Sequence, residues 1–229
     1  LKAIMPIGFT DDRYATDVHY QGGSVLASDM LSWSSIMFAF QALPPDPNNR
    51  ADWREEWLKR LKETPPYIEA WLTHQRRDAY WKHGSVCENY SDIETPVYAV
   101  SGWGDAYKDG VLRLLEHLSC PKKALIGPWS HGFPQRSEPG PQIGFLQEML
   151  RWWDYWLKDI DNGIMDEPML RVWMQESTPP QTYYEKQPGR WIGETNYPGL
   201  TLKTQQLFLN KNNRLAPRTS NEGTKTILG

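Results

Sequence analysis

Hydrophobic and polar positions along the 229 residues fall into successive patterns, each typical of one kind of structure. Residues 1–8 form a nearly continuous apolar run, as a buried parallel strand does. Residues 28–91 repeat apolar side chains every three or four positions, with charges between them, as amphipathic helices do. Because this stretch is too long for a simple crossover between two strands, it predicts a helical cap over residues 28–92.

Strand and helix patterns alternate over residues 93–165. Apolar runs at 97–100 and 122–127 predict two strands, and residues 106–118 and 143–160 have helical spacing. Strands that alternate with helices form parallel sheets with right-handed crossovers. The sequence therefore predicts an α/β fold, to which residues 1–27 contribute a further strand and loop.

The pattern changes again after Asp166. Short alternating runs, separated by Pro, Gly and Asn, continue to Gly229, as in all-β domains. These runs are too few to close a sandwich, so they predict a partial β-sandwich over residues 166–229. Since the chain also begins at Leu1 inside a strand pattern, we expect it to be truncated at both ends.

The composition argues against several classes of protein but does not indicate a function. A net charge of −3 and a pI of about 6.0 argue against nucleic acid or an acidic membrane surface as a partner. Nothing approaches the ~20 apolar residues of a membrane span, so we expect a soluble protein of the cytoplasm or periplasm. Cys87 and Cys120 are too few for a disulfide framework and lack metal spacing. The sequence is compatible with a homo-oligomer.

Neither a metal nor another cofactor is predicted. Residues 159–163, "DIDNG", carry oxygen ligands at intervals like those of a calcium loop. An Asn-Gly turn that ends a helix accounts for the same residues better. At Asp11–Arg13, "DDR", a salt bridge within the loop is favoured over a role in a site.

Two polar residues follow the strands predicted at 97–100 and 122–127: Asp105 in "GWGDAY" and His131 in "GPWSHG". Side chains just past the carboxyl ends of parallel strands line the ligand crevice, so we expect the two to lie within hydrogen-bond reach. An acid followed by a histidine matches the last two members of the Ser-Asp-His order. The carboxylate would orient the imidazole, which would act as the base. A turn aspartate and a structural histidine are the alternatives, and residue types alone leave them open.

Several segments together resemble the CocE/NonD hydrolases: "GWGDAY", "LIGPWSHG" and "WWDYWLKDIDNGI" followed by an all-β segment. That group includes cocaine esterase-like, α-amino-acid ester hydrolase-like and X-prolyl dipeptidyl-peptidase-like serine enzymes. The resemblance implies the second half of an α/β-hydrolase sheet, an inserted helical cap, and the start of a jelly-roll domain. It also implies that Asp105 is the triad acid and His131 the triad base of an enzyme that cleaves an acyl ester or peptide-like amide through an acyl-serine intermediate.

The nucleophile elbow of that group, G-x-S-x-G, does not occur in the sequence. "GGSVL" and "HGSVC" have Gly directly before Ser and no Gly two residues after it, and Ser130 lacks an elbow of its own. We expect the nucleophile and the oxyanion hole to lie in a missing N-terminal half, and the chain alone to be inactive. A non-catalytic binding module, suggested by the Trp- and Tyr-rich β segment, and a pseudoenzyme fragment are the alternatives.

Three aromatic residues flank the predicted acid and base: Trp103, Trp129 and Phe133. Each is a candidate for the wall of a substrate pocket, because large aromatic faces bury acyl groups well. Packing in the core or at the rim of the sheet is the equally weighted alternative.

Overall fold

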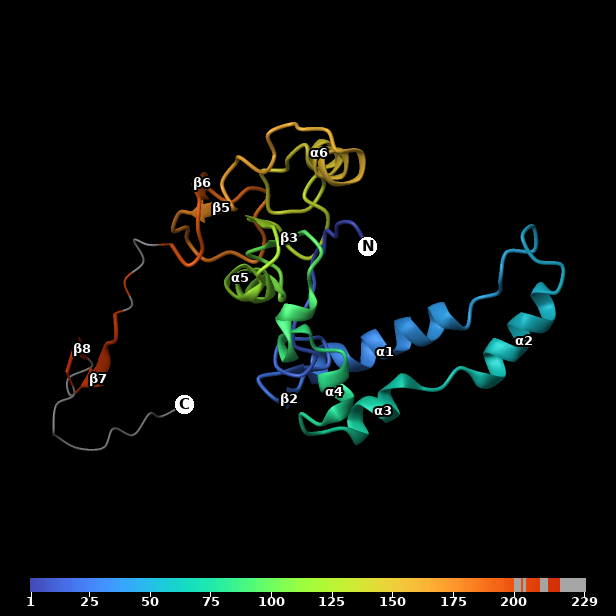
Figure 1. Cartoon of the computed structure of the whole chain (residues 1–229). Coiled ribbons are helices and arrows are strands. Elements are labelled where there is room, and N and C mark those ends of the chain that lie inside the picture. The colour runs from blue at the N-terminus through green and yellow to red at the C-terminus, as the bar shows by residue number, and fades with distance from the viewer. Residues whose placement is uncertain (200–202, 204, 211–213, 219–229) are drawn as a thin grey trace. The chain divides into compact units, whose positions relative to one another are not determined.

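The computed structural model describes residues 1–199, 203, 205–210 and 214–218. Contacts divide the chain into two compact units, Leu1–Tyr197 and Pro198–Gly229. The first unit contains the large sheet and the helices drawn in Figure 1. Each unit is described by itself.

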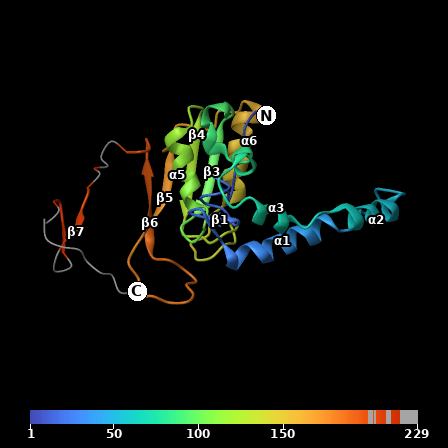
Figure 2. The ribbon, with the colours of Figure 1, turned by 90° about the horizontal axis from the view of Figure 1, so that it is seen from below.

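The sheet of the first unit has the order β3-β4-β5-β6, as Figure 2 shows. Its strands are β3 (Val97–Gly102), β4 (Lys122–Gly127), β5 (Leu170–Gln175) and β6 (Gly189–Glu194). The first three strands run parallel, and β6 runs antiparallel to β5. The two strands predicted at 97–100 and 122–127 are therefore confirmed, and Gly102 lies opposite Gly127 at their carboxyl ends.

Residues 1–8 run along β3 but do not form the continuous strand that their apolar run predicts. Isolated parallel bridges join Ile4 to Val97 and Ile7 to Val100. The Val100 amide donates to the carbonyl of Pro6 at 2.9 Å, but proline has no N–H to return to the neighbouring strand. The ladder is interrupted there, so the segment is a discontinuous edge of the sheet.

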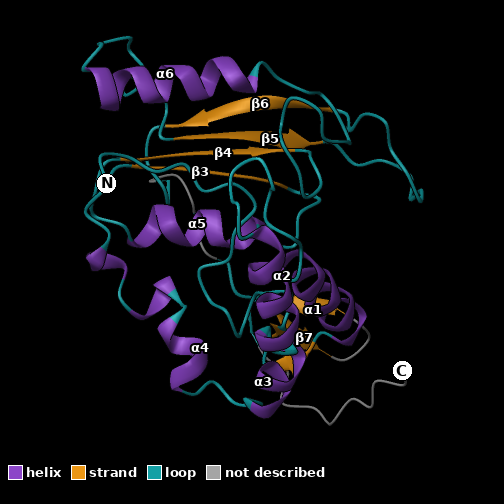
Figure 3. Ribbon diagram, turned by 90° about the vertical axis from the view of Figure 1, so that its right-hand side faces the viewer, coloured by secondary structure: helices purple, strands orange, loops and turns teal. Residues whose placement is uncertain are grey.

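Two helices cover the sheet on opposite faces, α5 (Lys108–His117) and α6 (Phe145–Lys158), as Figure 3 shows. Successive side chains of β3 alternate between these faces, as they must in a pleated strand. Val97 and Ala99 join the cluster on the α5 side, whereas Tyr98 and Val100 join Trp152 on the α6 side. Burying each of the two valines stabilises the fold by roughly 1.5–3 kcal/mol.

Residues 27–92 contain several helices joined by loops, as the apolar spacing predicts. The elements are α1 (Ala27–Gln41), α2 (Trp53–Glu63), α3 (Tyr67–Thr73), α4 (Ala79–His83) and two short 3₁₀ turns, η1 (Val86–Glu88) and η2 (Tyr90–Asp92). A short antiparallel hairpin precedes them; its strands, β1 (Tyr20–Gln21) and β2 (Ser24–Val25), have two residues each.

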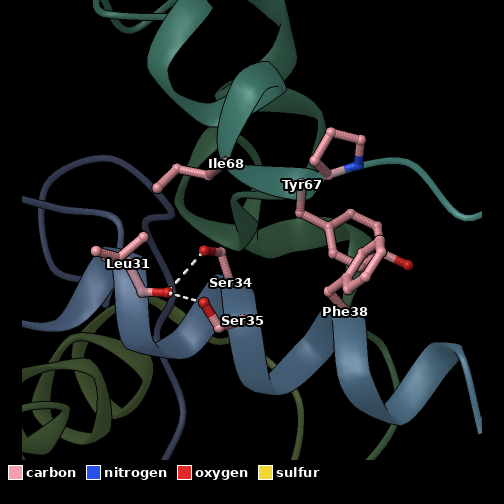
Figure 4. Close-up of a pocket in the computed structure, with 7 residues that line it drawn as sticks. Leu31, Ser34, Ser35, Phe38, Tyr67 and Ile68 are labelled. Carbon is pink, nitrogen blue, oxygen red and sulfur yellow. Dashed lines mark hydrogen bonds between the residues drawn. The ribbon is translucent and has the colours of Figure 1, made fainter.

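Helices α1 and α3 lie side by side and leave a shallow apolar hollow of about 230 Å³ between them (Figure 4). Leu31 and Phe38 of α1 face Tyr67 and Ile68 of α3 across this hollow. The hydroxyls of Ser34 and Ser35 both donate to the Leu31 carbonyl, so they offer no free donor to a ligand there.

The domain division predicted at Asp166 stays a prediction. Strands β5 and β6 fall in the segment predicted as a partial β-sandwich, and in the structure β5 pairs with β4 and the compact unit extends to Tyr197. The physical reason is burial: Leu170 and Val172 of β5 belong to the core cluster beneath α5. Alternation along a strand does not reveal which sheet that strand joins.

In the second unit the described residues include one antiparallel pair, β7 (Phe208–Asn210) and β8 (Arg214–Ala216). The remainder of the predicted jelly roll falls largely on residues outside the described part of the chain. That prediction therefore stays a prediction.

The helix predicted to end at residues 159–163 does end just before them, and the turn residues follow at 164–166. Helix α6 ends at Lys158, and Asp159 follows in the left-handed conformation, with φ 56°. Within the described ranges no cluster of three or more His, Cys, Asp or Glu side chains could hold a metal ion. No helix among the described residues is long and apolar enough to cross a membrane.

Candidate active site

Asp105 lies just beyond the carboxyl end of β3, in the turn that leads into α5. Its side chain is 2% exposed, and its Oδ1 accepts a hydrogen bond from the backbone amide of Tyr107 at 3.0 Å. Tyr107 is the residue before the first turn of α5, where free backbone amides and the helix dipole favour a negative group. The turn therefore holds a buried carboxylate in a fixed orientation.

His131 follows β4 in the same way and lies beside Asp105. Its Nδ1 is 3.0 Å from Asp105 Oδ2, so the hydrogen bond predicted from the sequence is confirmed. The imidazole side chain is 64% exposed. Within the described part of the chain Nε2 has no hydrogen-bond partner, and this nitrogen is left available to a reacting group.

Close backbone contact brings the two strand ends together. The Trp103 amide donates to the Gly127 carbonyl at 2.8 Å, and the Gly104 amide donates to the Trp129 carbonyl at 3.0 Å. A β-carbon at Gly102 would lie only 2.0 Å from that same Trp129 carbonyl oxygen. Glycine at position 102 is thus required for the loops of Asp105 and His131 to meet.

A pocket of about 410 Å³ opens beside the exposed face of His131. Tyr107 lines it, with its ring centroid 5.4 Å from that of the imidazole, and Trp33 of α1 supplies an apolar wall. Arg13 and Asp17, from the loop after residue 8, add an ion pair of 3.1 Å. The pocket thus combines apolar walls with a few fixed polar groups, as small-molecule sites do.

Charged contacts fix the loop that follows residue 8. Buried Asp11 accepts a bidentate interaction from Arg113 of α5, with a shortest distance of 2.6 Å, and a hydrogen bond from Tyr90 at 2.5 Å. Asp12 pairs with Arg77 at 3.2 Å. Arg13 pairs with Asp17 inside the loop, as expected, whereas Asp11 and Asp12 pair with arginines outside it. The same loop also contributes to the pocket, which was the less favoured alternative.

A hydrogen bond fixes Tyr107, whose ring lies beside the imidazole. Its hydroxyl donates to Asp17 Oδ1 at 3.1 Å. Burial, reinforced by the Asp17 carboxylate, raises the pKa of Tyr107 above its ordinary value. The phenol therefore stays protonated at neutral pH and remains a donor.

The three aromatic residues predicted to wall the pocket have separate positions, and none is among the side chains that line it. Trp129 is 1% exposed, packs in the core beneath α6, and donates from Nε1 to the Pro141 carbonyl at 3.0 Å. Trp103 is half-buried and donates to the Trp173 carbonyl at 2.7 Å. Phe133 is exposed, and the Arg136 guanidinium lies over its ring. These tryptophans stabilise the strand ends, because each indole finds its hydrogen-bond acceptor inside the fold.

Several other residues that line the pocket were not predicted, though some had a signal in the sequence. Tyr107 lies two residues after Asp105, and Gly8 ends the first apolar run, so the strand-end argument could have included both. Trp33 lies within a helical pattern, and nothing in its sequence context distinguishes it from a packing residue.

Several known proteins are similar to this chain. The sequence pattern of the X-Pro dipeptidyl-peptidase family (S15 family) matches residues 1–133, a segment that includes Asp105 and His131. A protein named as a serine esterase from Mycobacterium bovis is 29% identical over 128 residues, 53% of this chain and 18% of that protein. One named as an Xaa-Pro dipeptidyl-peptidase from Bacillus cereus is 27% identical over 104 residues, 43% of this chain and 17% of that protein. The chain thus spans less than a fifth of the length of these relatives.

Solved structures share the fold. A crystal structure of a CocE/NonD family hydrolase from Staphylococcus aureus superimposes with a TM-score of 0.68 at 20% identity, over 95% of this chain and 34% of that one. A second crystal structure of that protein gives a TM-score of 0.63 at 20% identity, over 92% and 33% of the two chains. Because the family pattern covers more than half of the residues, the chain belongs to the X-Pro dipeptidyl-peptidase (S15) family of hydrolases.

Proposed function

We propose that this chain supplies the acid and the base of a serine hydrolase that cleaves an acyl ester or a peptide-like amide. The observation that carries the proposal is the 3.0 Å contact between Asp105 Oδ2 and His131 Nδ1 at adjacent strand ends. The carboxylate holds the Nδ1–H tautomer and stabilises the imidazolium. Nε2 then takes the proton of the nucleophile and returns it to the leaving group.

The difference in exposure between the two side chains suits these roles. A buried carboxylate that also accepts a backbone amide keeps its orientation while the imidazole changes charge. The exposed edge of the imidazole lies at the pocket, where a nucleophile and a substrate carbonyl could approach together. No metal or cofactor takes part in the proposed steps.

The nucleophile, we infer, lies outside these 229 residues. The sequence contains no G-x-S-x-G elbow, and the chain spans 34% or less of the proteins that it resembles. In this proposal residues 1–27 and 93–165 form the later part of an α/β-hydrolase sheet, and the other part provides the serine and the oxyanion hole. The helices of residues 28–92 act as the cap, since α1 contributes Trp33 to the pocket.

The names of the relatives support the proposed substrate class. One is named a serine esterase and another an Xaa-Pro dipeptidyl-peptidase, so the family includes both ester and amide cleavage. Both reactions pass through the same acyl-serine intermediate and need the same base. The pocket beside His131 accepts an apolar group against Trp33 and Tyr107.

Labelling with a fluorophosphonate probe tests the proposal. We expect the longer protein that contains this chain to be labelled at a serine, and the 229-residue chain alone to remain unlabelled. In the longer protein, His131→Ala should abolish labelling, whereas His117→Ala should leave it unchanged. His117 is a suitable control because it is an exposed imidazole on α5 whose nearest carboxylate, Glu116, is 4.0 Å away.

Three results would contradict the proposal. Labelling of a serine within the 229 residues would place the nucleophile in this chain. Undiminished labelling of the longer protein after His131→Ala would show that the imidazole takes no part in the reaction. A longer protein that binds the substrate but never reacts with the probe would favour a binding module or a pseudoenzyme.

A further inference from the structure

Gly8 lies directly against the hydrogen-bonded pair of Asp105 and His131. A β-carbon at this position would lie 2.8 Å from Cε1 and 2.9 Å from Nδ1 of the imidazole, and 3.1 Å from Asp105 Oδ2. Contacts below 3.0 Å are shorter than real β-carbons make. The backbone at Gly8 also has φ +55°, a left-handed conformation that favours glycine.

The backbone around Gly8 is held in place and cannot easily yield. The Gly8 amide donates to the Val100 carbonyl of β3 at 3.0 Å, and the preceding residue, Ile7, forms a bridge with Val100. The loop beyond is fixed by the interaction of Asp11 with Arg113. An added methyl group would therefore have to displace the imidazole.

The imidazole has little else to hold it. Its side chain is 64% exposed, and its polar contact within the described residues is the one with Asp105. The ring of Tyr107 lies nearby, with a centroid separation of 5.4 Å. An exposed imidazole with one hydrogen bond would rotate into solvent if a methyl group at position 8 displaced it. The space left by the missing side chain of Gly8 therefore decides whether Nδ1 keeps its hydrogen bond to the Asp105 carboxylate.

We propose that Gly8 is a positioning residue: its missing side chain provides the space in which His131 keeps its hydrogen bond to Asp105. Any side chain at position 8 turns the imidazole away from the carboxylate and leaves the base without its orienting partner. The positional claim stands on the geometry, and its consequence for catalysis rests on the proposed function.

Gly22 offers a matched control. It has φ +57°, nearly the same as Gly8, but a β-carbon there would meet nothing within 4 Å. Both Gly8→Ala and Gly22→Ala force alanine into a left-handed conformation. Only the first places a methyl group against the imidazole.

The deciding measurement is the tautomer of His131, read from long-range ¹H–¹⁵N spectra of the histidine-labelled 229-residue chain. The unmodified chain and Gly22→Ala should show His131 as the Nδ1–H tautomer, held by Asp105. Gly8→Ala should shift the His131 nitrogens to the mixture of a solvated imidazole, in which Nε2–H dominates. An unchanged Nδ1–H signature in Gly8→Ala would overturn the proposal.

Melting curves show whether each variant remains folded. Gly22→Ala should lower Tm by roughly 2–8 °C through backbone strain alone. If Gly8→Ala does not fold, the double variant Gly8→Ala with His131→Ala decides, because removal of the imidazole removes the main clash. Folding of the double variant supports the proposal, and failure of the double variant to fold overturns it.

These readouts need no catalysis, so they separate this inference from the proposed function. In the longer protein Gly8→Ala should also lower kcat at least a hundredfold with a smaller change in KM, whereas Gly22→Ala should lower neither more than twofold. A displaced tautomer with unimpaired turnover would leave the positional inference standing and contradict the proposed role of His131.

Discussion

Three hydrogen-bonded aspartate–histidine pairs lie among the described residues of the first unit, and two of them differ sharply in what surrounds them. Asp105 and His131 meet at 3.0 Å with a buried carboxylate and a 64% exposed imidazole side chain. Asp17 and His19 meet at 2.8 Å, and both side chains are 2% exposed. Trp71 encloses the second imidazole, with ring centroids 4.1 Å apart.

The hydrogen bond alone therefore does not define a catalytic base. His19 has the shorter contact with its carboxylate, yet no substrate can reach a 2% exposed imidazole without local opening. Asp17 also accepts from Tyr107 and pairs with Arg13, so the second pair belongs to the structure that supports the pocket. Access to Nε2 at the edge of the sheet is the property that distinguishes His131 from His19.

Replacement of the two histidines should separate these roles most strongly. In the longer protein His131→Ala should lower kcat about 10⁶-fold, the loss seen when a triad base is removed, with little change in Tm. His19→Ala should change kcat less than tenfold and lower the free energy of unfolding by roughly 2–4 kcal/mol, since it empties a buried site among aromatic rings. Hydrolysis of a p-nitrophenyl ester and urea unfolding measure the two effects. Equal losses of kcat would remove the distinction.

Replacement of the carboxylate should have the next largest effect. Asp105→Asn keeps the shape of the side chain but donates toward Nδ1 and favours the wrong tautomer, so kcat should fall about 10⁴-fold. Asp109→Asn, in the first turn of α5, is the control and should leave kcat within twofold. Steady-state kinetics on the longer protein measure both variants. A decrease in kcat of less than tenfold in Asp105→Asn would show that Asp105 serves only to form the turn.

Chemical modification should sharpen the contrast without any catalysis. Diethylpyrocarbonate acylates exposed imidazoles, so His131 in the 229-residue chain should react at least about a hundredfold faster than His19, by analogy with the protection of sites that need local opening. Mass spectrometry of peptides taken at successive times gives both rates. Similar rates for the two histidines would show that the enclosure around His19 opens readily.

The smallest effect is expected at the link between the two pairs. Tyr107→Phe removes the hydrogen bond to Asp17 but keeps the ring beside His131, at a cost of about 1 kcal/mol in the free energy of unfolding. Because the pKa of Tyr107 is raised by burial and by Asp17, this loss should not depend on pH across the neutral range. Urea unfolding at several pH values measures it. A loss that disappears on mild alkalinisation would show that the phenol ionises there.

The sequence predicted most where periodicity and position along the chain were sufficient. The strands at 97–100 and 122–127, the helices between and after them, and the helical segment after residue 27 all follow from apolar spacing. The approach of Asp105 to His131 follows as well, because parallel strands end at one edge of a sheet. The interruption at Pro6 was also visible in the sequence, although the apolar run around it concealed its effect.

Residue order and residue type thus determined the alternation of strands and helices, the absence of a G-x-S-x-G elbow, and the pairing of an aspartate with a histidine at neighbouring strand ends. Tertiary structure alone decided that β5 and β6 join the same sheet, that Trp129 is buried, and that Gly8 and Tyr107 flank the imidazole. The physical reason is that periodicity reports which face of an element is apolar. Which neighbour covers that face depends on contacts between residues far apart in the chain.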